Sequence, residues 1–469
     1  MNQTEPLPNQ APHQDIATLF YTRCAELYAN PPALIGMVMP YSVLRSGHHL
    51  KWRRGEYSGT GKDHGPVFGL DLRVYEPWDL DNVVPDFFRM PASVVFAQKV
   101  ATGEGTALAP ATVQVWRGDW EKDFAGISRS GEILYHDDGT FRSPYGELST
   151  QGPTMFDRRL FFVETIESTA KIQTALATKV SPRLGSQDHY KYENQLHKLE
   201  GVVSNDHLFD VYVGACLAPY VALNPLKAVL PVCRSTMTMP LEHDENCDGS
   251  THKQCHLDMA ALHPNMQIRW QHISDMYYNA NKKRTIRDLY RNLNHNGKLT
   301  SQLEYLQRLI AGNSGVRVAY TAQGEPTAAI IEDNHAVIES KAYQVKCWNR
   351  AEAYYVLAII NSNHLASQAK PFCTTNWAKK IRDFHLHAWK LPIPRYDSTN
   401  PLHGRLSELG NAAEQECTAM IVASDILTKP PGGSQSDTAR QLIRREWQPN
   451  SPTAHNIETA VGELLPRTD

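Results

Sequence analysis

The stretch Leu34-Ile-Gly-Met-Val-Met-Pro-Tyr-Ser-Val-Leu44 contains a continuous apolar run that stops at a proline. A strand that is covered on both faces of a sheet has this character, so residues 34–39 are predicted to form a central parallel strand. Pro40 ends the run, and residues 42–54 are predicted to form the following helix. Upstream, apolar residues recur at spacings of three and four from Asp15 to Ala29, which predicts a helix with Asp15 as its N-cap.

A second informative stretch, Trp78-Asp-Leu-Asp-Asn-Val-Val-Pro-Asp-Phe-Phe-Arg-Met-Pro-Ala-Ser-Val-Val-Phe96, lies 34 residues further along. The alternation of apolar residues over 68–78 predicts one strand, and the β-branched residues within 92–97 predict another. The resulting order is helix, strand, helix, strand, strand. It indicates an α/β fold and is typical of the later part of a doubly wound sheet.

Composition narrows the class of protein. The 469 residues leave room for two or three domains, and 41% hydrophobic with 21% charged residues is ordinary for a folded chain. Eight cysteines spread over this length indicate reduced thiols and a cytoplasmic protein. No apolar run approaches the roughly 18–20 residues that cross a bilayer, so no membrane association is expected. A net charge of −3 does not by itself indicate a nucleic-acid partner.

Changes in composition divide the chain into four segments. Residues 1–14 are polar and Pro-rich and are predicted to be a disordered tail, and residues 15–165 contain the predicted strands and a Gly- and Pro-punctuated bridge. Residues 166–400 form a second region, an α+β domain with its clearest helices at 282–291, 300–309 and 351–361. Residues 401–469 are predicted to form a helical tail that is interrupted by a linker, Lys429-Pro-Pro-Gly-Gly-Ser434.

Two clusters of basic residues are candidates for contacts with DNA. Between Asn281 and Ile310 seven basic residues stand against two acidic ones, and residues 283, 284, 287 and 291 share one helical face. A second cluster mixes aromatic and basic residues over 377–387. Since each neutralised phosphate releases a condensed counterion, such surfaces suit DNA, although an ordinary solvated helix would look the same. The predicted DNA-binding residues are Lys282, Lys283, Arg284, Arg287, Arg291, Lys379, Lys380 and Arg382.

Two patterns could be read as metal sites. His243, Cys247, His252, Cys255 and His256 lie close together, but their separations match no common zinc knuckle, so a surface loop is the preferred interpretation. The other pattern, Asp333 with Glu339-Ser-Lys341, would suit a magnesium-dependent nuclease. Carboxylates near a lysine are common on strands, so no metal is expected.

Several segments, taken in order, resemble the large N6-adenine-specific DNA methyltransferases, including type IIG-like and BREX-like restriction-modification enzymes. The resemblance rests mainly on residues 78–96 and on Ala351-Glu-Ala-Tyr-Tyr-Val-Leu-Ala-Ile-Ile-Asn-Ser362, followed by Leu391-Pro-Ile-Pro-Arg-Tyr-Asp397 and His403. Gly315-Val-Arg-Val-Ala-Tyr320 and Asp157-Arg-Arg-Leu-Phe-Phe-Val163 also fit the pattern. The similarity covers most of residues 15–425.

The resemblance implies the carboxyl-terminal half of a Rossmann-like methyltransferase sheet over 15–165, then a target-recognition domain over 166–400 and a helical tail. In this family the target adenine is flipped out of the duplex and its N6 takes the methyl group of S-adenosylmethionine. The implied adenine-pocket candidates are Pro40, Ser42, Phe87 and Phe88. The two phenylalanines could equally be core residues.

The motifs that carry the family's chemistry are not found in this sequence. There is no Asp/Glu-x-Phe-x-Gly-x-Gly cofactor loop, and Asn30-Pro31-Pro32-Ala33 lacks the aromatic residue of the catalytic tetrapeptide and is predicted to be a turn. No catalytic residue is therefore identified. The expected function is a partial or split adenine methyltransferase of a restriction-modification or phage-defence system. Its expected partners are double-stranded DNA and, for a split enzyme, a chain that carries the other half. The alternatives are a non-catalytic DNA-specificity module and an inactive gene remnant.

Overall fold

The computed structural model divides into two units, and each is described by itself. Unit 1 comprises residues 1–142 and 367–383, and unit 2 comprises residues 143–366 and 384–469. The sequence-predicted boundary at 165/166 falls inside unit 2. The residues that the structure describes are 16–45, 49–53, 55, 70–84, 92–101, 103–105, 112–122, 126–133, 141–155, 157–166, 176–183, 192, 194–242, 256–281, 286–375 and 381–466.

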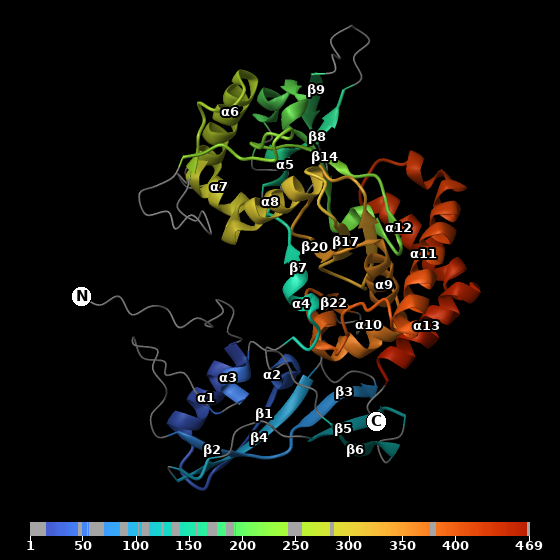
Figure 1. The fold of residues 1–469 in the computed structure, drawn as a ribbon. Helices are drawn as coiled ribbons and strands as arrows, with labels where there is room; N and C mark the ends of the chain where they lie inside the picture. The colour runs from blue at the N-terminus through green and yellow to red at the C-terminus, as the bar shows by residue number, and fades with distance from the viewer. Residues whose placement is uncertain are drawn as a thin grey trace. The chain divides into compact units, whose positions relative to one another are not determined.

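Unit 1 is built on a six-stranded sheet with the order β1-β4-β3-β5-β6, in which β2 also pairs with β4 (Figure 1). Only β3 and β5 run parallel among these strands, and the other pairs are antiparallel. The strands are β1 (Leu34–Pro40), β2 (Asp71–Val74), β3 (Trp78–Val84), β4 (Ala92–Val100), β5 (Thr112–Asp119) and β6 (Ser128–Ile133). The helices are α1 (Ile16–Tyr28), α2 (Ser42–Arg45) and α3 (Leu50–Arg53), and β21 (Thr374–Thr375) pairs with β22 (Ile381–Asp383).

The core of unit 1 lies between α1 and one face of this sheet, where Tyr21 and Ala25 pack with Met39, Val95 and Val115. The structure confirms the helix predicted at 15–29 as α1, although Leu19, Phe20 and Leu27 of its apolar spacing are exposed. The turn predicted at Asn30–Ala33 is also confirmed, and the Ala33 amide donates to the Asn30 carbonyl. The strand predicted at 92–97 is confirmed as β4.

Two finer predictions for unit 1 are wrong. β1 is not a central parallel strand, because it pairs antiparallel with β4 and leaves Leu34 74% and Val38 48% exposed. Although β1 carries apolar residues on both faces, one of its faces is therefore partly exposed to solvent. The alternating stretch at 68–78 is not one strand either, since β2 ends at Val74 and Trp78 begins β3.

Unit 2 contains two larger sheets. A six-stranded sheet has the order β10-β9-β8-β14-β11-β19, and a four-stranded antiparallel sheet has the order β18-β17-β20-β7. The strands of the first are β8 (Phe162–Thr165), β9 (Ala177–Pro182), β10 (Gly201–Ser204), β11 (Leu208–Tyr212), β14 (Leu226–Val229) and β19 (Val337–Ile338). Those of the second are β7 (Ser149–Gln151), β17 (Val316–Thr321), β18 (Ala328–Ile331) and β20 (Ala342–Cys347). The two-stranded pairs are β12 (Leu217–Ala218) with β13 (Val221–Ala222) and β15 (Leu241–Glu242) with β16 (His256–Leu257).

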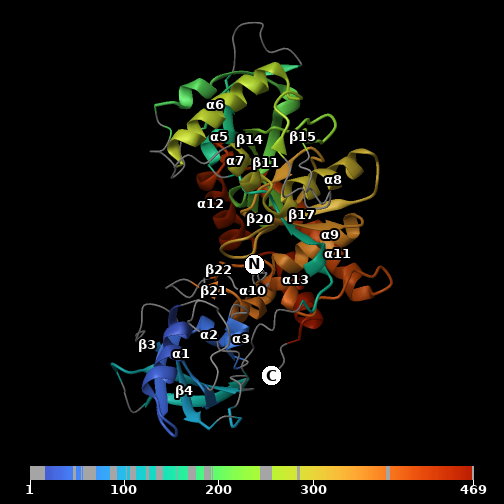
Figure 2. The same ribbon diagram turned by 90° about the vertical axis from the view of Figure 1, so that its left-hand side faces the viewer.

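Helices cover both sheets of unit 2 (Figure 2). α6, α7 and α8 share a core with the six-stranded sheet, which includes Trp270, Leu289 and Leu306. α9 packs on β17 and β18. These helices are α4 (Tyr145–Leu148), α5 (Arg158–Phe161), α6 (Pro264–Ala280), α7 (Ile286–Leu293), α8 (Lys298–Ile310), α9 (Arg350–Ile360) and α10 (Asn363–Ala369), whose last residues belong to unit 1. The predicted helices at 300–309 and 351–361 are confirmed as α8 and α9.

The helical tail consists of α11 (Pro401–Val422), α12 (Gly433–Leu442) and α13 (Pro452–Leu464). α11 packs against α9 and α13, and arginines join α12 and the turn after it to the rest of unit 2. Arg440 donates to the Leu217 carbonyl at 2.9 Å and Arg444 donates to Thr327 Oγ1 at 2.9 Å. The predicted α/β class with a helical tail is confirmed. Within the described ranges, none of the helices has the length and apolar character that crossing a membrane requires.

Candidate functional site

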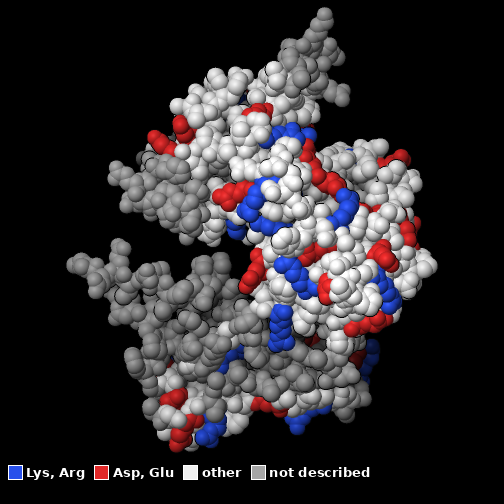
Figure 3. All heavy atoms as spheres, in the orientation of Figure 1, with Lys and Arg blue, Asp and Glu red and all other residues white. Residues whose placement is uncertain are grey.

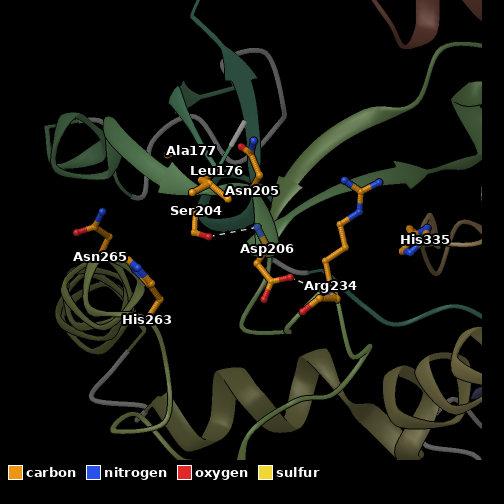
Figure 4. A pocket seen from close by; sticks show the side chains of 10 residues that line it. Leu176, Ala177, Ser204, Asn205, Asp206, Arg234, His263, Asn265 and His335 are labelled. Carbon is orange, nitrogen blue, oxygen red and sulfur yellow. Dashed lines mark hydrogen bonds between the residues drawn. The ribbon is translucent and has the colours of Figure 1, made fainter. Parts of the chain in front are cut away.

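An open pocket of about 600 Å³ lies in unit 2, within the segment predicted to recognise DNA (Figure 4). Its walls come from β9, the turn between β10 and β11, the loop after β14, the start of α6 and the loop before β19. Most of the side chains that line it are polar. They are Leu176, Ala177, Ser204, Asn205, Asp206, Arg234, Ser235, His263, Asn265 and His335.

Asp206 fixes the loop that carries Arg234. One carboxylate oxygen accepts from the Cys233 thiol and the other from the Ser235 amide, both at 2.7 Å, and the Asp206 carbonyl accepts from the Arg234 amide. Burial alone would raise the pKa of Asp206, but the hydrogen bonds from Cys233 and Ser235 bring its pKa below the ordinary value. Asp206 is thus an ionised carboxylate that is occupied by its own loop.

The same loop is held at its far end by α8. Gln307 donates through Nε2 to the carbonyls of Thr236 and Met237 at 3.1 and 3.2 Å. The Met237 side chain is buried, and an isolated bridge pairs Cys233 with Thr238. Because the loop is held at both ends, the backbone at Arg234 is fixed without a ligand.

A second loop carries Asp333 and brings His335 to the pocket. Asp333 Oδ1 accepts from the His335 amide at 2.8 Å, and the fully buried Arg317 of β17 donates to the carbonyls of Asp333 and Ala336. Burial lowers the pKa of Arg317, and the charge of Asp333 opposes that shift. Asp333 Oδ2 lies 4.0 Å from Arg234 Nη2, so this loop also helps to orient the Arg234 guanidinium.

The start of α6 forms the opposite wall. His263 is the N-cap residue, Pro264 occupies the first turn, and the Asn265 side chain is exposed in the pocket. In Figure 4, His263 and Asn265 lie on one side of Asp206, and Arg234 and His335 lie on the other. In the chain neighbour of Asp206, His207, burial lowers the pKa, and its Nδ1 lies 2.8 Å from the Val232 carbonyl.

This arrangement suits binding more than catalysis. Among the described residues that line the pocket, Asp206 is the one with a carboxylate, and it already accepts two hydrogen bonds, which leaves it poorly placed to act as a general base. Arg234, Asn205 and Asn265 are the side-chain types that contact phosphates and the edges of bases. The pocket therefore presents hydrogen-bonding groups on a rigid frame.

The predicted adenine-pocket residues are only partly visible. Pro40 ends β1 and Ser42 begins α2, both half-buried, whereas Phe87 and Phe88 lie outside the described residues. Next to them, the Ser93 hydroxyl donates to the Met39 carbonyl. A proline, a tyrosine and a serine at this end of β1 offer no acidic group to bind a ribose. These three residues therefore do not by themselves fit the ribose of S-adenosylmethionine.

The structure describes only some of the predicted DNA-binding residues. Arg291 is exposed in α7, and Arg287 belongs to the same helix, but its side chain is outside the described part. Arg382 in β22 belongs to unit 1 and lies 3.8 Å from the Asp383 carboxylate. Outside the described residues are Lys282, Lys283, Arg284, Lys379 and Lys380. On the face shown in Figure 3, basic and acidic side chains alternate.

The geometry argues against a nuclease centre at Asp333, Glu339 and Lys341. Glu339 is 3% exposed, and its carboxylate accepts from Arg158 Nη2 at 3.1 Å, the Ser340 hydroxyl at 3.0 Å and the Lys341 amide at 2.9 Å. It is thus a structural carboxylate. No trio of potential metal ligands is found among the side chains that the structure describes. The histidine- and cysteine-rich cluster at 243–256 lies outside them.

The pocket itself was not predicted from the sequence. The polar run Ser204-Asn-Asp-His207 between two apolar strands was the available signal, together with Asp333-Asn-His335 before β19. Polar residues between strands usually indicate only a turn, so neither run marks a site. Arg234 and Asn265 carry no local signal, and only the fold brings them together.

No family model matches the chain, and no curated protein matches it. A solved structure of the Type IIL restriction-modification enzyme MmeI in complex with DNA aligns with 96% of this chain, at 9% identity and a TM-score of 0.45. This is a loose similarity to a restriction-modification enzyme. The chain spans 49% of the length of that enzyme chain.

Proposed function

We propose that this chain supplies DNA target recognition to an adenine-specific methyltransferase of a restriction-modification system. The observation that carries the proposal is the open pocket of unit 2, which Arg234, Asn205 and Asn265 line and in which Asp206 holds the loop of Arg234. The sequence resemblance assigns the same segment to target recognition. In this proposal double-stranded DNA is the partner, and the pocket contacts its phosphates or base edges.

The methyl transfer itself would need groups that this sequence does not contain. A partner chain, or a further part of the same polypeptide, would bind S-adenosylmethionine and supply the Asn-Pro-Pro-aromatic motif. Unit 1 would then complete the catalytic domain. If co-expression with such a chain left cellular DNA free of N6-methyladenine, this part of the proposal would be contradicted.

Replacing Arg234 by Ala tests the pocket. We expect the variant to bind duplex DNA roughly 5- to 100-fold more weakly, because one charged contact to a phosphate or a base is lost. Fluorescence anisotropy with a labelled duplex measures this. Arg405→Ala is the matched control, since Arg405 is an exposed arginine of α11 that is paired with Glu463 at 3.2 Å. Equal binding by the two variants would show that the pocket does not contact DNA.

The rival function is a specificity module with no role in methylation. The two hydrogen bonds that the Asp206 carboxylate accepts favour binding over catalysis, and they are compatible with both proposed functions. The two differ in their response to the cofactor and to a catalytic partner. A chain that binds DNA but never supports methylation with any partner would favour the rival.

A further inference from the structure

Trp348 is a large aromatic residue that is exposed on the surface of unit 2. Its side chain is 66% exposed in the short connection between β20 and α9. The Arg395 guanidinium lies over its ring, 5.5 Å from the centroid. The pair forms a flat aromatic and cationic surface on unit 2, which we call the Trp348–Arg395 stack.

A buried carboxylate holds both members of the stack. Glu352 is 2% exposed, accepts from the Trp348 amide at 2.5 Å, and lies 3.4 Å from Arg395 Nε. Glu352 occupies the third position of α9, whose N-cap is Asn349, and such a glutamate normally bonds to the backbone at the helix start. Here it reaches one residue further back, to Trp348.

The segment around Arg395 is fixed on both sides by tyrosines. Tyr355 donates its hydroxyl to the Pro394 carbonyl at 3.0 Å, and Tyr145 accepts from the Tyr396 amide at 3.0 Å. Tyr145 also donates to Glu352 Oε1 at 3.1 Å. Burying this many polar groups to hold one exposed pair costs free energy, so the stack is a preorganised surface and not an incidental exposed tryptophan.

We infer that the Trp348–Arg395 stack binds an unpaired nucleobase of the DNA. A tryptophan ring with a cation on one face offers its other face to a base, and stacking of this kind tolerates any base. The Arg395 side chain, which is 39% exposed, adds a guanidinium beside the ring, whereas Arg350 is paired with the exposed Glu332 and Lys346 lies over the Tyr305 ring. An exposed ring with a cation against it suits a base next to a phosphate better than it suits an apolar protein surface. The inference rests on the proposed DNA-binding function.

A photocrosslinking experiment with the full chain tests the inference. The probe is a duplex that carries one extrahelical 5-iodouracil, with the fully paired duplex as its control. We expect ultraviolet light to crosslink the base to the tryptic peptide Cys347–Arg350, and Trp348→Ala to abolish the crosslink. We also expect this variant to bind the extrahelical probe roughly 5- to 100-fold more weakly, with the paired duplex much less affected. Trp348→Phe should retain most of both signals.

Val422→Ala is the matched control, because Val422 is also 66% exposed and lies in α11. The inference is overturned if Trp348→Ala binds the extrahelical probe like the wild type, or if the crosslink maps elsewhere while Arg234→Ala weakens duplex binding. That second result would leave the proposed function standing. Loss of self-association in Trp348→Ala, without any crosslink in the wild type, would overturn it in favour of a protein contact. Absence of any DNA binding would overturn both proposals.

Discussion

Replacing Gly410 by Ala is expected to destabilise unit 2 by roughly 3 kcal/mol or more. A Cβ atom at this position of α11 would lie 2.2 Å from the Tyr354 carbonyl oxygen and 2.9 Å from its carbonyl carbon. Both are backbone atoms of α9, so the clash cannot be relieved by turning a side chain. The two helices would have to separate along their contact. Urea unfolding, together with hydrogen exchange of the α9 and α11 amides, measures the effect.

The same helix provides the control. Gly404 also lies in α11, and a Cβ atom there would have no neighbour within 4 Å. Gly404→Ala should therefore be neutral or should stabilise the helix by up to about 1 kcal/mol, because alanine has the higher helix propensity. Similar unfolding free energies for the two variants would mean that α9 and α11 do not pack as described.

Replacing Glu352 by Ala is expected to cost about 2–4 kcal/mol. The substitution leaves the Trp348 amide and the Tyr145 hydroxyl without their acceptor and removes the buried partner of Arg395. Because the Arg395 side chain is 39% exposed, water partly solvates its charge when Glu352 is removed. The expected loss of unfolding free energy is therefore smaller than for a fully buried ion pair. Chemical unfolding followed by near-ultraviolet circular dichroism would report the change.

Glu332→Gln is the matched control for Glu352→Ala. Glu332 also pairs with an arginine, Arg350 at 2.5 Å, but its side chain is 63% exposed. Exposed pairs of this kind contribute at most about 1 kcal/mol. A loss of stability in Glu332→Gln as large as that in Glu352→Ala would contradict the structural role assigned to Glu352.

The positions of three helices were predictable from the sequence, but not always the face that each one buries. α8 buries its apolar stripe, α9 is buried nearly all round, and α1 exposes Leu19, Phe20 and Leu27 of its stripe. Strand direction was not predictable. The apolar run of β1 is equally compatible with a parallel and an antiparallel partner, and the partner is β4, almost 60 residues away in the sequence.

The candidate site and the stack depend on contacts between distant residues. Tyr145 contacts Glu352 across 207 positions of the chain, and Arg234 lies 4.0 Å from Asp333 across 99 positions (333 − 234). Local sequence patterns carry no information on contacts between residues so far apart in the chain. The resemblance did point to the segments 351–362 and 391–397, and the structure shows that Glu352 and Arg395 from these segments are in contact. Their individual side-chain roles appear only from that contact.

The most direct test of the account is the binding of the purified chain to duplex DNA at about 50 and about 200 mM salt, with and without S-adenosylmethionine. We expect binding that weakens at least about tenfold over this range, because phosphate contacts release counterions. We also expect a preference for one sequence and no response to the cofactor. Failure to bind duplex DNA at the lower salt concentration would contradict the claim that this chain recognises DNA.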